Sequence, residues 1–238
     1  MKNKTAFITG GTKGIGLGIA QKLLQEGINV CITGRNRDTV ADTVARLRKI
    51  SNTAQVRGEE ADVRNYNKLV NAVENTVREF GGIDYLVANA GVGHFVSIED
   101  LSMEQWHETM DVNLTGVFYT VKAALEEIKK TQGYIFTISS LAGTNFFEKG
   151  SAYNASKFGL TGFTQALMLD VRKYGVKTTT IMPGSVATEF NHPTPGTSDE
   201  WKIQKEDIGQ LIFDLIGMHP RVLPSKVEVR PTNPSRTK

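Results

Sequence analysis

The chain has 238 residues, with 28 Lys or Arg against 25 Asp or Glu, so its formal net charge is +3. That length fits one α/β domain, and the charge balance without a basic block excludes a nucleic-acid-binding surface. The single cysteine, Cys31, excludes a disulfide framework or a cysteine-based metal site; no apolar stretch is long enough to span a membrane, so a cytoplasmic protein without a metal is expected.

Strand-like and helix-like segments alternate along the chain, which predicts a parallel sheet covered on both faces by helices. The strands are expected at residues 5–8, 29–33, 54–57, 83–88, 133–138, 176–182 and 227–229. The helices are expected from residue 15, and then over 38–50, 69–80, 103–130 with an interruption near 114–116, 153–174 and 206–218. The predicted fold is therefore α/β and doubly wound, with seven mainly parallel strands in a single domain over residues 1–230, followed by a flexible tail at 231–238.

A glycine-rich turn, residues 9–16, separates the first strand from the first helix. Strand, glycine turn and helix together present backbone N–H groups and the positive end of the helix to an anion. Glycine also lets the backbone approach a pyrophosphate closely. The spacing is T-G-x-x-x-G-x-G, and it makes the following residues candidates for contact with a dinucleotide: Gly10, Thr12, Lys13, Gly14, Ile15 and Gly16.

The end of the second strand indicates which dinucleotide binds. In such folds a carboxylate about 20 residues beyond the glycine turn binds the ribose 2′-OH of NAD, but here the strand ends at Gly34-Arg35. A 2′-phosphate at about 4 Å from Arg35, Arg37 or Lys13 would gain roughly 4 kcal/mol at an effective dielectric constant near 20, before desolvation. The sequence thus favours NADP(H), while Asp38, turned back to the ribose, keeps NAD open.

Tyr153 and Lys157 lie four positions apart and hence on one face of a helix. Such a pair alone is more often an exposed pair without a function. Two further residues change that weighting: Ser140 ends the fifth strand, at the edge where open parallel sheets bind ligands, and Asn113 lies near the expected break of a long helix. Strand alternation favours Ser140 over its neighbour Ser139.

Together these features resemble the short-chain dehydrogenase/reductase family, in a compact single-domain branch, up to about Arg230. The resemblance implies a Rossmann-type fold and a catalytic set of Ser140, Tyr153, Lys157 and Asn113. Tyr153 would donate the proton, Ser140 would polarise the carbonyl oxygen, and Lys157 would bind the nicotinamide ribose. The backbone at Asn113 would hold a water. Since free tyrosine has a pKa near 10, we expect Lys157 and the positive nicotinamide of the oxidised cofactor to lower the pKa of Tyr153 toward about 7, which is worth roughly 4 kcal/mol.

The resemblance also implies further cofactor contacts beside the glycine turn. These are Asp62 and Val63 at the adenine, Asn89, Ala90 and Gly91 near the nicotinamide ribose, and Pro183, Gly184, Val186 and Thr188 at the carboxamide. Arg35, Tyr153 and Lys157 complete the expected NADP(H) site.

The activity implied is reduction of a ketone or aldehyde by NADPH, or the reverse oxidation of an alcohol. Two alternatives stay open: a 3-oxoacyl-acyl-carrier-protein reductase and a non-catalytic NADP sensor. A carrier protein could be met by basic residues at helix ends, namely Lys129, Lys130, Arg172 and Lys173. The C-terminal Val227–Pro231 segment lacks an Asp-Gly-Gly ending and is similar to that of sepiapterin-reductase-like carbonyl reductases.

Aromatic and histidine residues are candidates to face the nicotinamide: His94, Phe95, Phe146, Phe147, Phe190, His192 and Trp201. Such a set suits an apolar or ring-containing small-molecule carbonyl compound, although several of these side chains could instead pack the core or an interface. The resemblance further implies a homodimer or homotetramer formed through the helices at 103–130 and 153–174.

Overall fold

The computed structural model describes residues 4–190 and 195–233. Within these residues one sheet has the strand order β3-β2-β1-β4-β5-β6-β9, and every neighbouring pair is parallel. Its strands are β1 Thr5–Ile8, β2 Asn29–Gly34, β3 Val56–Glu60, β4 Tyr85–Ala88, β5 Tyr134–Ile138, β6 Lys177–Pro183 and β9 Lys226–Val229. The predicted doubly wound, seven-stranded, single-domain fold is confirmed.

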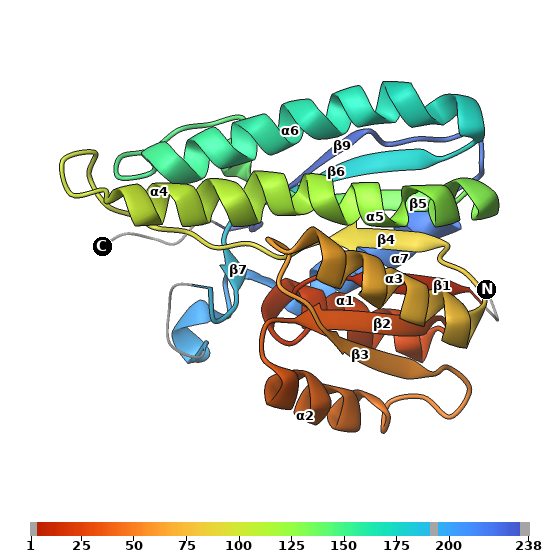
Figure 1. Cartoon of the computed structure of the whole chain (residues 1–238). Helices are drawn as coiled ribbons and strands as arrows, with labels where there is room; N and C mark the ends of the chain where they lie inside the picture. Colours follow the sequence, from red (N-terminus) through yellow and green to blue (C-terminus); the bar gives the residue numbers. More distant parts are fainter. Residues whose placement is uncertain (1–3, 191–194, 234–238) are drawn as a thin grey trace.

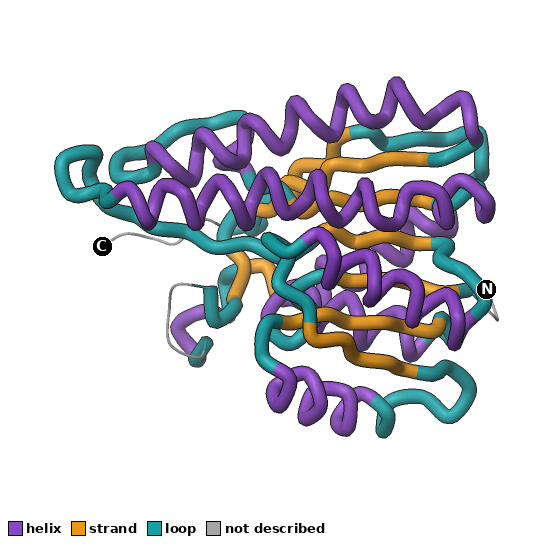
Figure 2. Tube along the Cα trace, viewed as in Figure 1, coloured by secondary structure: helices purple, strands orange, loops and turns teal. Residues whose placement is uncertain are grey.

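Helices cover both faces of this sheet (Figures 1 and 2). They are α1 Gly14–Gln25, α2 Arg37–Leu47, α3 Tyr66–Phe80, α4 Met103–Met110, α5 Gly116–Thr131, α6 Ser151–Val171 and α7 Lys205–Gly217. Side chains of α1, α2 and α7 join one apolar core, and those of α3, α5 and α6 join the other.

The two cores follow from the period of the strands. Successive side chains of a strand point to opposite faces, so Ala6 and Ile8 of β1 belong to the core under α1 and α7, while Phe7 belongs to the core under α3 and α5. Because helices cover both faces, β1 is buried at every position. Cys31 is fully buried, as expected, and burial raises the pKa of its thiol to about 12.

The long helix expected at 103–130 is interrupted by a π-helical turn, Asp111–Thr115, between α4 and α5. The predicted break is therefore present, although it starts a few residues earlier than expected. A π turn inserts one extra residue into the helix and is frequent at functional sites. Here it contains the buried side chain of Asn113.

The third strand was predicted at 54–57 and this was wrong by several residues, because β3 runs over Val56–Glu60. The apolar pattern does not mark it, because β3 lies at one edge of the sheet and carries Arg57, Glu59 and Glu60. Its carboxylates meet cations: Lys68 Nζ lies 2.7 Å from Glu60, and Arg57 pairs with Glu59 at 2.5 Å.

The segment after β6 contains strands that were not predicted. Two short strands, β7 Val186–Ala187 and β8 Ile203–Gln204, pair in parallel beside the main sheet. Part of this segment, and of the tail expected at 231–238, lies outside the described residues. Within residues 4–190 and 195–233, none of the helices has the length and apolar character to span a bilayer.

Candidate active site

The glycine turn lies at the point where the strand order reverses. The chain moves outward from β1 to β2 and β3, and then returns to the other side of β1 with β4. Open parallel sheets bind ligands at such a point, beyond the carboxyl ends of the strands. The Asn89 side chain, just after β4, ties the two sides together, since its Nδ2 donates to the carbonyl oxygens of Thr9 at 2.9 Å and Gly10 at 3.1 Å.

Two glycines in this turn have the left-handed φ that side chains rarely adopt, Gly10 at 65° and Gly14 at 53°. A Cβ on Gly10 would lie 2.9 Å from the Cα of Ala90. Gly16 packs behind the turn, where a Cβ would lie 2.4 Å from the Gly10 carbonyl oxygen. The turn can therefore take this shape only with glycine at these positions.

A cavity of about 1020 Å³ extends from the glycine turn across the ends of β4, β5 and β6. Most of the residues predicted for the site line it: Gly10, Thr12, Lys13, Gly14, Ile15, Arg35, Asp62, Val63, Asn89, Ala90, Gly91, Ser140, Tyr153, Lys157, Pro183, Gly184, Val186 and Thr188. Gly16 and Asn113 are not among its lining residues. The volume is at the upper end of the range for small-molecule sites, so it admits a dinucleotide together with a second ligand.

Asn113 acts from behind the cavity wall. Its side chain is fully buried; Oδ1 accepts from the backbone N–H of Val92 at 2.8 Å, and Nδ2 donates to the Val92 carbonyl oxygen at 2.8 Å and to the Ser156 hydroxyl at 3.0 Å. One amide therefore joins the π turn, the loop after β4 and helix α6. We call this set of contacts the Asn113 brace.

Ser140, Tyr153 and Lys157 meet at one end of the cavity. Ser140 follows β5, and its hydroxyl accepts from the backbone N–H of Ala142 at 3.1 Å. The hydroxyl also lies in hydrogen-bond contact with the Tyr153 phenol, where it lowers the pKa of that phenol. Ser139 points elsewhere, since its hydroxyl donates to the backbone carbonyl oxygen of Lys157 at 3.3 Å.

Burial dominates the ionisation of the tyrosine and the lysine. It raises the pKa of Tyr153 to about 12, against the smaller opposite effect of the hydrogen bond from Ser140. It also lowers the pKa of Lys157 to about 8. The ammonium donates to the Ile138 carbonyl oxygen at 2.9 Å and lies 5.6 Å from the centre of the Tyr153 ring.

The expectation that the pKa of Tyr153 is lowered toward 7 is therefore not met by the protein's own groups. The physical reason is that the phenol is only 9% exposed, so the loss of hydration of a phenolate outweighs the neighbouring dipoles and charge. At neutral pH this phenol therefore keeps its proton.

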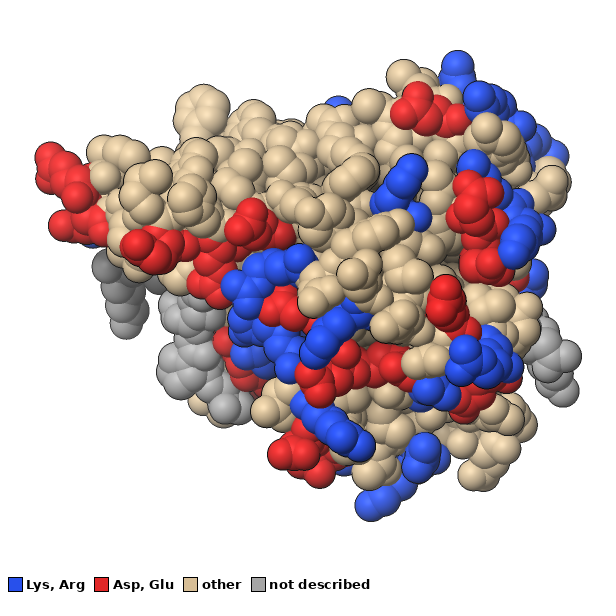
Figure 3. All heavy atoms as spheres, viewed as in Figure 1, with Lys and Arg blue, Asp and Glu red and all other residues tan. Residues whose placement is uncertain are grey.

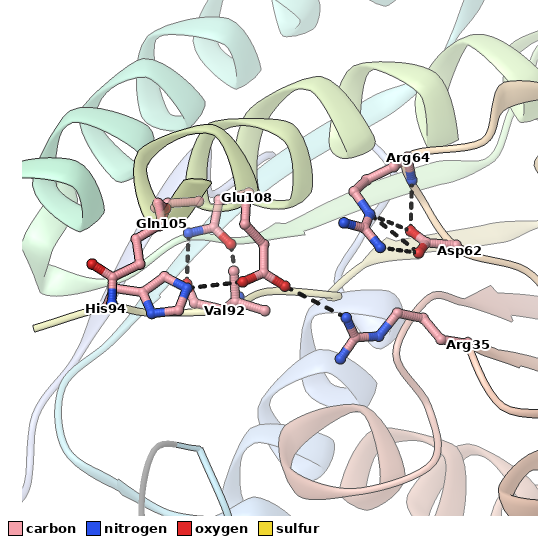
Figure 4. Close-up of polar contacts among 9 residues, drawn as sticks. Arg35, Asp62, Arg64, Val92, His94, Gln105 and Glu108 are labelled. Carbon is pink, nitrogen blue, oxygen red and sulfur yellow. Dashed lines mark hydrogen bonds and ion pairs between the residues drawn. The ribbon is translucent and has the colours of Figure 1, made fainter. Parts of the chain in front are cut away.

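Charged residues gather at the other end of the cavity (Figure 4). The guanidinium of Arg35, which is 60% exposed, lies 3.6 Å from Glu108, and the second oxygen of Glu108 lies 2.9 Å from His94 Nε2. Asp62 is paired with Arg64 at 2.6 Å, and that hydrogen bond is the main cause of its lowered pKa. Arg35 thus faces the cavity with one carboxylate beside it.

Two other residues considered for this end lie apart from it. Arg37 lines a separate groove of about 560 Å³ between α2 and β3. Asp38 is exposed in the first turn of α2 and is not among the residues that line the main cavity. The possibility that Asp38 turns to a bound ribose therefore finds no support in this arrangement.

The aromatic candidates divide into two groups. Phe95, Phe147, Phe190 and Trp201 line the cavity. Phe146 does not, because it is 84% exposed and its ring stacks on Phe158 at a centroid distance of 6.4 Å. His94 does not line the cavity either, and His192 lies outside the described residues.

Two residues that shape the site were not predicted. Glu108 holds Arg35 and His94, and Asn154 Nδ2 donates to the carbonyl oxygens of Ala142 at 2.8 Å and Asn145 at 2.7 Å, which holds the loop after Ser140 against α6. Asn154 stands next to Tyr153 in sequence, and that proximity was the one signal available. Nothing local marks Glu108. Across residues 4–190 and 195–233, His, Cys, Asp and Glu side chains form no cluster able to hold a metal ion.

Comparisons with known proteins indicate a family of oxidoreductases. The sequence profile of a family described as short chain dehydrogenase matches residues 4–198. An uncharacterized oxidoreductase of Staphylococcus saprophyticus is 33% identical over 232 residues, which cover 97% of this chain and 98% of that protein.

Two solved structures are similar over nearly their whole length. An alcohol dehydrogenase from the archaeon Thermococcus sibiricus, complexed with 5-hydroxy-NADP, is 27% identical with a TM-score of 0.90, over 96% of this chain and 97% of that one. A short chain dehydrogenase from Burkholderia cenocepacia in complex with NADP is 28% identical with a TM-score of 0.86, over 96% of each chain.

Proposed function

The chain belongs to the short-chain dehydrogenase family of oxidoreductases, and on that premise we propose that it is an NADPH-dependent carbonyl reductase that also oxidises the corresponding alcohols. Residues 1–230 would form the domain that binds both cofactor and substrate. The observation that carries the proposal is the meeting of Ser140, Tyr153 and Lys157 in the cavity that begins at the glycine turn.

The residues of the cavity fit a phosphorylated dinucleotide. The glycine turn leaves the backbone N–H groups at the start of α1 open to a pyrophosphate, since Gly14 begins that helix. Lys13 and Arg35 both line the cavity, and their charges favour a 2′-phosphate over a free hydroxyl. Similar proteins bound to NADP support this choice.

At the other end we assign the catalytic roles to the protein's own groups. When bound, NADPH supplies the hydride. Tyr153 holds a proton at neutral pH and donates it to the carbonyl oxygen as negative charge develops there. Ser140 donates a hydrogen bond to the same oxygen, and Lys157 binds ribose hydroxyls. The Asn113 brace keeps the loop after β4 in register with α6.

The test is the conversion of Tyr153→Phe, with NADPH oxidation followed on a panel of ketones and aldehydes. We expect turnover to fall by at least about a hundredfold, because general acid catalysis typically contributes 10²–10⁴. NADPH binding, measured by fluorescence, should stay nearly intact. A non-catalytic NADP sensor would instead bind NADPH without turnover in the wild-type protein as well.

Ser139 and Ser140 offer a matched control. Ser140→Ala removes the hydroxyl that contacts Tyr153, whereas Ser139→Ala removes one that donates to the Lys157 carbonyl oxygen. Turnover should fall much further in Ser140→Ala. Equal losses in the two variants would contradict the assignment of Ser140.

A 3-oxoacyl-acyl-carrier-protein reductase is less well supported than a reductase of free carbonyl compounds. Lys129 and Lys130 are ion-paired with Glu126 at 2.8 Å and Glu127 at 2.6 Å. They lie at the end of α5 that leads into the amino end of β5, while Ser140 follows the carboxyl end of that strand. A carrier docked on these lysines would face away from the cavity.

We also propose a homodimer or homotetramer that associates through α5 and α6. Side chains on these helices leave apolar surface exposed, including Phe118 at 45%, Phe158 at 42% and Leu169 at 53%. Figure 3 shows that few charged side chains lie over this part of the face. Exposed apolar patches of this kind mark association surfaces. Light scattering after size-exclusion chromatography tests the assembly, and a monomer would refute it.

A further inference from the structure

Three phenylalanine rings from three separate loops form a cluster beside Tyr153, whose ring is in contact with Phe95 and Phe190, while Phe147 contacts Phe95. Phe95 follows β4, Phe147 precedes α6, and Phe190 follows β7. The centre of the Phe95 ring lies 5.2 Å from that of Tyr153, 5.7 Å from Phe147 and 6.5 Å from Phe190, and Tyr153 lies 6.0 Å from Phe190. We call Phe95, Phe147 and Phe190 the aromatic clamp.

The clamp faces the cavity and is not fully covered by the protein. All three rings line the cavity, and Phe95 is 39% and Phe147 48% exposed. A ligand that removes apolar surface of this kind from water is bound more tightly, because the burial is favourable. Aromatic rings add edge-to-face or offset contacts with a further ring. The neighbouring Phe146 turns away onto Phe158, so the orientation of Phe147 is specific to the cavity.

The clamp lies where a substituent of the carbonyl carbon would extend from the reacting atom. A carbonyl oxygen that receives the Tyr153 proton must lie within about 2.6–3.2 Å of its hydroxyl. The group attached to the carbonyl carbon then lies next to the Tyr153 ring, where Phe95 and Phe190 are. The clamp offers ring atoms alone, so an anionic group there would lose hydration without gaining a partner.

We propose that the aromatic clamp binds an uncharged carbon ring attached next to the carbonyl group, so that the substrates are ring-bearing ketones or aldehydes. This inference rests on the proposed carbonyl reduction and adds the class of substrate and the residues that select it. Small aliphatic carbonyl compounds would leave the clamp in contact with water.

The first test compares 1-phenylethanone with butan-2-one, which share the methyl ketone. With NADPH, the wild type should prefer the phenyl ketone in kcat/KM by at least about tenfold, since each ring contact is worth roughly two- to tenfold. Phe95→Leu and Phe190→Leu should each reduce this ratio by roughly two- to tenfold. The matched control is Phe213→Leu on α7, whose ring lies beneath Lys22 and outside the cavity, and it should leave the ratio unchanged.

A binding measurement separates the failure of this inference from the failure of the proposed reduction. Saturation-transfer NMR with ethylbenzene should give a signal in the wild type that weakens in Phe95→Leu and persists in Phe213→Leu. Binding of ethylbenzene without turnover of either ketone would support the clamp and overturn the reductase assignment. Equal kcat/KM for the two ketones, with no ethylbenzene signal, would overturn the clamp and leave the reductase standing.

Discussion

The charge of Arg35 gives the sharpest test of the cofactor end of the site. Arg35→Gln removes a cation that lines the cavity where we place the 2′-phosphate. Because the side chain is 60% exposed, the effective dielectric constant lies between about 20 and 80, and the attraction at 4 Å lies between about 1 and 4 kcal/mol. Glu108, at 3.6 Å, pairs with the same guanidinium and so weakens its attraction for a phosphate. We therefore expect a loss in the lower half of that range, about 1–2 kcal/mol.

This loss should appear in kinetics as a change in cofactor preference. The value of kcat/KM for NADPH should fall by about 5- to 30-fold in Arg35→Gln, while that for NADH should change less than about twofold. Both are measured with one saturating carbonyl compound. The matched control is Arg37→Gln, which removes the same charge from the separate groove between α2 and β3. An unchanged NADPH-to-NADH ratio in Arg35→Gln, or an equal shift in Arg37→Gln, would refute the reasoning.

Two further predictions concern charge. Glu108→Gln removes the carboxylate that competes with the 2′-phosphate for Arg35. Because an exposed ion pair is worth about 0.2–1 kcal/mol, KM for NADPH should fall by a few fold. A rise in KM would show instead that Glu108 positions the arginine. Burial lowers the pKa of Lys157 to about 8, from 10.5 for a free lysine. Between these two pH values the unfolded chain binds a proton that the folded chain does not. The free energy of unfolding therefore rises with pH across this range. Compared with Lys157→Met in urea unfolding, the wild type should gain up to about 3 kcal/mol from pH 8 to 10.5; a pH-independent difference would contradict the burial effect.

The parts of the molecule that the sequence predicts well are those with local causes. The glycine turn follows directly on β1, the pair Tyr153 and Lys157 is fixed by helical spacing, and Ser140 is placed by the end of β5. The bounds of most strands follow from local apolar runs in the sequence. Strand β3, at one edge of the sheet, is an exception, because Arg57, Glu59 and Glu60 interrupt its apolar pattern.

The parts that the sequence does not predict depend on contacts between distant segments. Glu108 meets Arg35 across more than seventy positions of the chain, and no local pattern marks the pair. The direction of the pKa shift of Tyr153 depends on how deeply the whole fold buries the phenol. Likewise, Phe146 and Phe147 are adjacent, and only the path of the loop decides which ring enters the cavity.

The Asn113 brace has a consequence for how the substrate range of such a site can change. The helix that carries Tyr153 is anchored through Ser156 to the side chain of Asn113 in the π turn, 43 residues earlier in the chain. Phe95 stands on the loop that the brace holds at Val92, whereas Phe147 and Phe190 stand on two loops that the brace does not contact. Exchanging Phe147 or Phe190 should therefore change which substituents fit the cavity, while Tyr153 keeps its position.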